Sequence, residues 1–193
     1  MLNSELSQYT NVELSQYTNY YLATATALGE VKTYIFDRTS QDVERWKELR
    51  DKGLQNMTDL ELQEWFGEIK TTPAATKGMY THNDMNRVEI AVSRLSERLS
   101  ELGYTHATLS TKTDWARYSV ATRNDMIRYY GNVKTLRDSI AVYANTPTAP
   151  TVGARLDYKL ANDIEKILKD IDEITTNLTK TWIYAGEIVS GEV

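Results

Sequence analysis

The sequence of 193 residues contains no cysteine, and this absence excludes disulfide bonds, thiolate metal sites and cysteine nucleophiles. Histidine is almost as scarce: His82 and His106 have no second ligand at metal-binding spacing, so we expect no bound metal. No apolar run is long enough to cross a membrane, and the first residues lack the basic-then-apolar order of a signal peptide. We therefore expect a soluble chain that has no membrane partner.

Basic residues are also in deficit, because 22 Lys and Arg face 27 Asp and Glu and leave a formal net charge of -5. No run of Lys or Arg offsets this balance locally, so no basic field is available to hold phosphates and we expect no nucleic-acid partner. With 41% apolar and 25% charged residues, the composition is typical of a globular protein. The length fits one domain, alone or with an arm.

Motifs that carry chemistry are missing as well. The sequence has no Gly-rich phosphate loop, no nucleophile elbow and no zinc-binding helix motif. Acidic pairs such as Glu61 with Glu64, and Asp170 with Glu173, have helical spacing, but charged residues at this spacing usually form the solvated face of a helix. We therefore assign no catalytic, cofactor-binding or metal-binding residue, and we expect a protein that is not an enzyme and takes no cofactor.

What is present is a repeated unit. The pattern Thr-x-(Gln/Asn)-Asp-apolar-x-Arg begins at Thr39, Thr81 and Thr122, at offsets of 42 and then 41 residues. A threonine followed by an acidic residue three positions later is the signature of a capping box, in which each residue binds a free backbone amide of the first helical turn. Further helix starts are expected at Thr58 and Asp157.

Apolar residues recur in steps of three and four after the second and third caps and along the last segment, which is the a/d pattern of a helix with one covered face. The three stripes are Met85, Val88, Val92, Leu95, Leu99 and Leu102; Met126, Tyr129, Val133, Leu136, Ile140 and Tyr143; and Leu160, Ile164, Ile167, Ile171, Ile174 and Leu178. Three helices of about 20 residues, each about 30 Å long, could cover one another as an antiparallel bundle. The spacing is equally compatible with stripes that close between chains.

Helix stops agree with these starts, because Gly53 and Gly103 directly follow two of the segments and Pro147 and Pro150 interrupt the chain after a third. The sequence predicts helices near residues 39–52, 58–69, 82–102, 123–144 and 157–179. The fold class is mainly α: an antiparallel helical bundle built from repeated capped helix units, with an extended N-terminal arm and a short C-terminal tail. The domains are an arm (1–33), a first helical unit (34–79), a three-helix bundle (80–183) and a tail (184–193).

The N-terminal arm contains an identical duplication, because the heptapeptide of residues 5–11 recurs as residues 13–19. It is either a poorly ordered arm left by a slippage duplication or an arm that orders against a neighbouring subunit through its tyrosines. The tail repeats a small-Gly-Glu triplet, and it is either frayed or a short strand or hook.

Four tryptophans are spread along the chain, at positions 46, 65, 115 and 182. Because tryptophan is buried on average, we expect these side chains to pack in the core, and Trp115 to pin the loop before Thr122 onto the helices. The alternative is a module that binds a cell-surface glycan through exposed Trp and Tyr faces.

Several short segments resemble phage and prophage tail-associated proteins of Gram-positive bacteria, in the same order along the chain. The segments are residues 34–39, 42–43, 53–58, 80–89, 125–126 with Arg128, 160–168, 184–187 and 190–192. The resemblance extends over residues 34–193 and leaves the duplicated arm outside it.

This resemblance implies a virion structural protein, a baseplate, tail-tip or fibre-linked component that is assembled in the bacterial host cytoplasm and ends in the virion tail. The partners that it implies are further copies of the chain, in a homo-oligomer, and neighbouring virion proteins. It supplies no binding residues.

Overall fold

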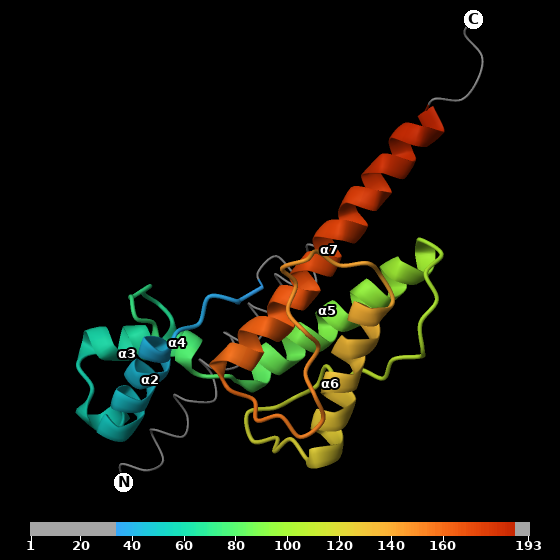
Figure 1. The fold of residues 1–193 in the computed structure, drawn as a ribbon. Helices are drawn as coiled ribbons and strands as arrows, with labels where there is room; N and C mark the ends of the chain where they lie inside the picture. Colours follow the sequence, from blue (N-terminus) through green and yellow to red (C-terminus); the bar gives the residue numbers. More distant parts are fainter. Residues whose placement is uncertain (1–33, 188–193) are drawn as a thin grey trace, which may run out of the picture. The chain divides into compact units, whose positions relative to one another are not determined.

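The computed structural model describes residues 34–187, with side chains described for residues 34–181 (Figure 1). In this part the chain is mainly helical and has no strand, which confirms the predicted class. The helices are α2 Ser40–Lys52, α3 Asp59–Phe66, α4 Ala75–Gly78, α5 His82–Glu101, α6 Arg123–Asp138 and α7 Tyr158–Glu187, with a short 3-10 turn η1 at Leu54–Asn56. The predicted arm, residues 1–33, and residues 188–193 of the predicted tail lie outside the described part.

The predicted helix starts are confirmed. Four helices begin with a complete capping box, in which a threonine hydroxyl accepts from the third backbone amide and the acidic side chain of that residue accepts from the threonine amide. At α5 the Thr81 amide donates to Asp84 Oδ2 over 2.7 Å. Asp157 accepts from the Leu160 amide over 2.9 Å at the start of α7. The four capping threonines are Thr39, Thr58, Thr81 and Thr122.

Two predicted glycine stops are confirmed by their backbone. Gly53 and Gly103 have φ angles of 75° and 82°, a region that residues with a Cβ rarely adopt. After α5 the Gly103 amide donates to the Ser100 carbonyl and the Tyr104 amide donates to the Leu99 carbonyl. These two hydrogen bonds form a Schellman motif. The carbonyls at the end of α5 therefore have partners.

Three predicted helix ends are wrong. α3 ends at Phe66 rather than at 69, because Gly67 takes the left-handed conformation. α6 ends at Asp138 rather than at 144, because the amide and hydroxyl of Ser139 both bind the Leu136 carbonyl and close the last turn. Arg137 Nε then donates to the Pro147 carbonyl over 2.6 Å and ties down the returning chain.

The third wrong end belongs to α7, which continues to Glu187 instead of ending at 179. It therefore includes residues 184–187 of the predicted tail and passes through Gly186. A glycine inside a helix costs about 1 kcal/mol relative to alanine, and a helix that is already formed tolerates this cost.

The core lies where α5, α6 and α7 meet, and each of these helices contacts the other two. The central residues of all three predicted stripes are 1% exposed or less: Leu95, Leu99, Val133, Leu136, Ile164, Ile167 and Ile171. These stripes are therefore covered within one chain. Tyr143, which was predicted to extend the second stripe, lies outside α6 and is exposed.

The shorter helices α2, α3 and α4 contact one another. α4 and the 3-10 turn were not predicted. A Cβ on Gly78 would lie 2.0 Å from the Asp42 carbonyl oxygen, so α4 approaches α2 backbone to backbone at a point where only glycine fits.

We predict that Leu95→Asp or Leu136→Asp lowers the free energy of unfolding by several kcal/mol, on the order of 4, because each places an unpaired charge in the core. Leu60→Asp is the matched control, since Leu60 is 68% exposed. Urea denaturation of the three variants measures the difference. Equal stability of all three would show that the core is misplaced.

Candidate functional site

The most unusual feature of the described chain is a group of charged side chains enclosed between the helices. Arg38 Nη2 lies 2.8 Å from Glu165 Oε1 and 3.1 Å from Asp84 Oδ1. Arg87 Nη2 lies 2.7 Å from the same two oxygens. The side chains of Arg38 and Glu165 are 2% and 0% exposed. Two guanidinium groups therefore neutralise two carboxylates, and the charges can stay buried because they are paired.

An extended segment, residues 34–38, delivers Arg38 to this group. Its hydrogen bonds run along α7: the Ile35 amide donates to Glu165 Oε2 over 2.6 Å, and the Tyr34 hydroxyl donates to Asp172 over 3.2 Å. The Asn162 side chain accepts from the Arg38 amide and donates to the Arg38 carbonyl, over 3.0 and 2.8 Å. These hydrogen bonds to α7 satisfy backbone groups that would otherwise need a neighbouring strand, and they fix the position of Arg38.

The arginine that closes each repeated sequence unit has the same role in all three units. Each binds a buried glutamate of another helix through two or three hydrogen bonds: Arg45 binds Glu64, Arg87 binds Glu165 and Arg128 binds Glu89. The closest approaches are 2.7, 2.7 and 2.5 Å. Two-pronged contacts of this kind match the planar guanidinium group.

Sequence reasoning recognised the threonine and the aspartate of the unit but gave the arginine no partner. Its recurrence six residues after each threonine was the available signal. The expectation that acidic pairs form a solvated face is wrong for Glu64 and Asp170, which are both buried. Asp170 accepts hydrogen bonds from Lys166 Nζ and from the Thr146 hydroxyl.

Two tyrosines extend the charged group toward α6. The hydroxyls of Tyr80 and Tyr129 lie 2.6 Å apart, and the Arg38 guanidinium lies 5.3 Å from the centre of the Tyr80 ring. Burial raises the pKa of both tyrosines above the ordinary value. Burial alone would lower the pKa of Arg87, but the charges of Asp84 and Glu165 raise it above the ordinary value. The two phenols therefore stay neutral at neutral pH.

Neither histidine makes a hydrogen bond with the residues of this group in the described part of the chain. Burial lowers the pKa of His82 in the first turn of α5, and the nearby charge of Arg117 lowers it further. His106 Nε2 lies 3.1 Å from the Ser96 carbonyl oxygen. Among the side chains described, those of residues 34–181, no three His, Asp or Glu are placed to hold a metal ion. None of the helices described is long and apolar enough to cross a membrane.

Trp115 is buried and pins its loop as expected. The Asn86 side chain donates to the Trp115 carbonyl over 2.9 Å and accepts from the Trp115 amide over 2.8 Å. Trp46 is half-buried, with the Arg50 guanidinium 4.8 Å from its ring centre, and Trp65 is half-buried as well. Trp182 lies in α7 beyond the described side chains.

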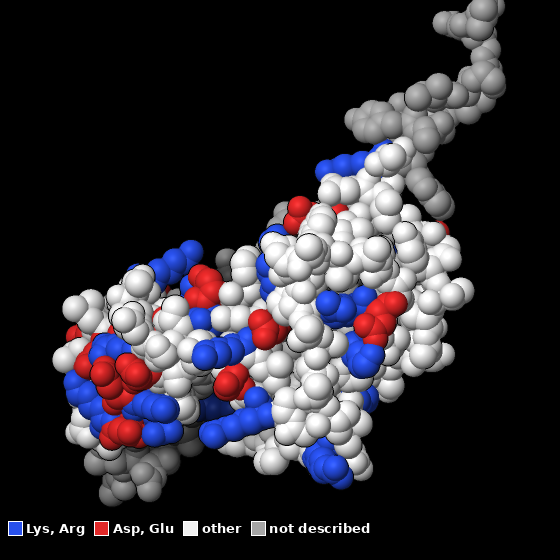
Figure 2. Space-filling view, in the orientation of Figure 1, with Lys and Arg blue, Asp and Glu red and all other residues white. Residues whose placement is uncertain are grey.

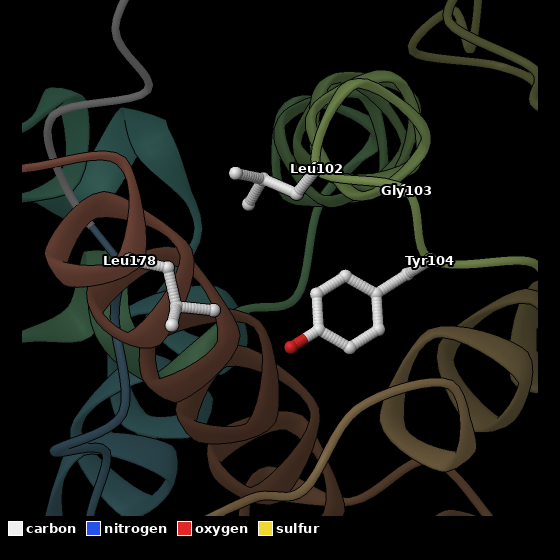
Figure 3. Close-up of a pocket in the computed structure, with 4 residues that line it drawn as sticks. All are labelled: Leu102, Gly103, Tyr104 and Leu178. Atoms are coloured by element: carbon white, nitrogen blue, oxygen red, sulfur yellow. The ribbon is translucent and has the colours of Figure 1, made fainter. Parts of the chain in front are cut away.

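A small hollow lies between the end of α5 and α7, with a volume of about 120 Å³ (Figure 3). Leu102, just after the end of α5, and Leu178 of α7 face it, and the ring of Tyr104 closes one side. Sites for small molecules usually enclose about 300–1,000 Å³, so this hollow is small even for a compact ligand.

No family model matches the chain, and no curated protein and no solved structure is significantly similar to it.

We predict that Glu165→Gln or Glu89→Gln lowers the free energy of unfolding by about 3–5 kcal/mol, because each removes a buried carboxylate and leaves a mostly covered arginine charge without it. The control is Glu173→Gln, which removes an exposed pair with Lys169 and should change stability by less than about 1 kcal/mol. Thermal or urea unfolding compares the three. A Glu165→Gln variant as stable as the control would mean that the pairs do not support the fold.

Acid should destabilise the protein. The Arg45 hydrogen bonds hold the pKa of Glu64 below its ordinary value, the Thr122 hydroxyl does the same for Asp125, and the Lys52 ammonium lowers the pKa of Glu61 to about 2. These carboxylates bind fewer protons in the folded than in the unfolded chain. Their contribution is therefore complete above pH 4.5, the ordinary glutamate value, and disappears as pH falls toward 2.

Urea midpoints measured across this acidic range should fall steadily, and the fall should be smaller in Glu64→Gln, which has no proton to gain. A midpoint independent of pH would contradict this assignment.

Proposed function

We propose that the chain is a non-enzymatic structural protein of a phage virion, a tail, baseplate or fibre-linked component that assembles in several copies. The observation that carries the proposal is where the resembling segments fall. Arg38, Asp84, Arg87, Glu89 and Glu165 all lie in the segments that resemble phage tail-associated proteins. The resembling segments therefore contain the Arg38 group and two of the three arginine–glutamate pairs, whereas the Arg45–Glu64 pair lies outside them.

We further infer the finer architecture from the same contacts. The three long helices form an antiparallel bundle of repeated capped units, and the bundle acts as a rigid spacer between neighbouring proteins. Side chains enclosed as ion pairs fit this role, because each pair has its full strength in only one arrangement of the helices. The arm, residues 1–33, then supplies contacts to neighbouring subunits in the virion tail.

The glycan-binding alternative depends on exposed tryptophan faces. Trp115 is buried, and the Arg50 guanidinium lies over the ring of Trp46, so two of the tryptophans that it would use are engaged within the chain. The contacts of these two residues favour the structural role over this alternative.

We expect an antibody against the chain to label the tails of purified particles from the source organism in electron microscopy, and light scattering to find a discrete homo-oligomer. A strictly monomeric chain that is absent from particles would refute the proposal. Binding to isolated cell walls that is lost in Trp46→Ala, with an unchanged melting temperature, would establish the glycan-binding alternative instead.

A further inference from the structure

The described chain consists of two bodies, each of which is held together from within. The α2–α4 lobe, residues 39–79, packs its helices on one another, and the main body, residues 34–38 and 80–187, packs α5, α6 and α7 on one another. Figure 1 shows the lobe beside the main body, joined to it by a narrow connection at the end of α4. The lobe has buried apolar side chains of its own, Leu49 and Ala75.

Polar contacts are also internal to each body. The Arg45–Glu64 pair lies inside the lobe, and the other two arginine–glutamate pairs lie inside the main body. Among the hydrogen bonds and ion pairs of the described residues, only the contact between Lys77 and Asp37 joins the two bodies. Both of these side chains reach solvent, and an exposed pair of this kind adds little to stability.

Two backbone connections join the bodies, and they lie side by side. One connection is the Arg38–Thr39 peptide, and the other is the Met79–Tyr80 peptide. On the lobe side, α4 meets α2 backbone to backbone at Gly78. On the main-body side, the Arg38 guanidinium lies 5.3 Å from the centre of the Tyr80 ring. Two adjacent connections leave one axis of rotation free, whereas connections far apart would prevent rotation.

The residues at the two connections suit a hinge. Thr39 caps α2 and Met79 follows α4, and both have extended backbone, with φ angles of −121° and −100°. Positions at the ends of helices are where hinges absorb changes in backbone angles. The neighbouring residues of the main body are held in place, Arg38 by its buried ion pairs and Tyr80 by the Tyr129 hydroxyl at 2.6 Å.

The surface charges of the lobe do not fix its position either. Figure 2 shows acidic and basic side chains interspersed on the visible face of the lobe. A mixed surface produces no field of one sign that would draw the lobe to a particular part of the main body.

We propose that the α2–α4 lobe is a hinged rigid body that rotates relative to the main body about the paired connections at Thr39 and Met79. The Lys77–Asp37 contact favours the arrangement in Figure 1 without locking it. The hinge follows from contacts within one chain and does not depend on the virion role. It gives the chain one adjustable end, which can meet a neighbouring molecule at different angles while the arginine–glutamate pairs keep each body rigid.

Distances between spin labels on the purified full chain test the hinge. The chain has no cysteine, so each label attaches only at an introduced site. Double electron–electron resonance measures the distribution of distances, with labelled chains diluted in unlabelled chains so that only distances within one chain are recorded. The cross-body pair is Lys47→Cys with Lys134→Cys, the lobe pair is Lys47→Cys with Lys70→Cys, and the main-body pair is Lys134→Cys with Lys159→Cys, all at exposed positions.

Lys47 lies about 12 Å along α2 from Thr39, so a rotation of about 25° moves its label by about 5 Å. The cross-body distribution should therefore be broader than both internal distributions by about 5 Å. Asp37→Asn, which removes the contact between the bodies, should broaden it further. Asp51→Asn, which removes a similarly exposed pair inside the lobe, is the control and should leave it unchanged.

Broadening of the cross-body distribution that appears only in Asp37→Asn also supports the hinge, because it shows that the Lys77 contact restrains the rotation. A cross-body distribution as narrow as the internal ones in the unaltered chain and in both variants overturns the hinge. A lobe pair as broad as the cross-body pair overturns it as well, because the lobe is then not a rigid body.

Discussion

Each of the three arginines that close the repeated sequence unit neutralises a glutamate that the fold has removed from water. Moving a carboxylate out of water costs several kcal/mol unless a well-placed positive charge meets it, so the burial of Glu64, Glu89 and Glu165 depends on helices that keep each of them against its arginine. The hydrophobic stripes would tolerate some sliding of one helix on another. The ion pairs do not, because a displaced helix leaves a charge enclosed without a partner.

The extended segment at residues 34–38 depends on the same interaction. Glu165 accepts hydrogen bonds from the Ile35 amide, from Arg38 and from Arg87, so one side chain joins this segment, α5 and α7. The capping residue Asp84 has two roles, because it caps α5 through one oxygen and binds Arg38 and Arg87 through the other. Polar side chains here fix the arrangement of helices whose stability comes largely from the apolar core.

Local features of the fold could be read from the sequence. A capping box is formed by neighbouring residues, which is why each helix start at Thr39, Thr58, Thr81 and Thr122 was predicted to within one residue. The stripes were predicted because a 3.6-residue period needs no knowledge of the partner. Features that depend on distant residues were missed: Glu64 was placed in water, and the close approach at Gly78 had no local signal. The early end of α6 was missed although its cause is local, since Ser139 closes the last turn on the Leu136 carbonyl.

The central claim is that the arginine–glutamate pairs specify how the helices meet, and a double-mutant cycle on Arg128 and Glu89 tests it most directly. Urea unfolding of Arg128→Met, Glu89→Leu and the double variant gives the coupling energy between the two side chains. The account predicts that each single variant is strongly destabilised and that the double variant recovers much of the loss, with a coupling of about 2 kcal/mol or more. Additive effects, with a coupling near zero, would contradict it.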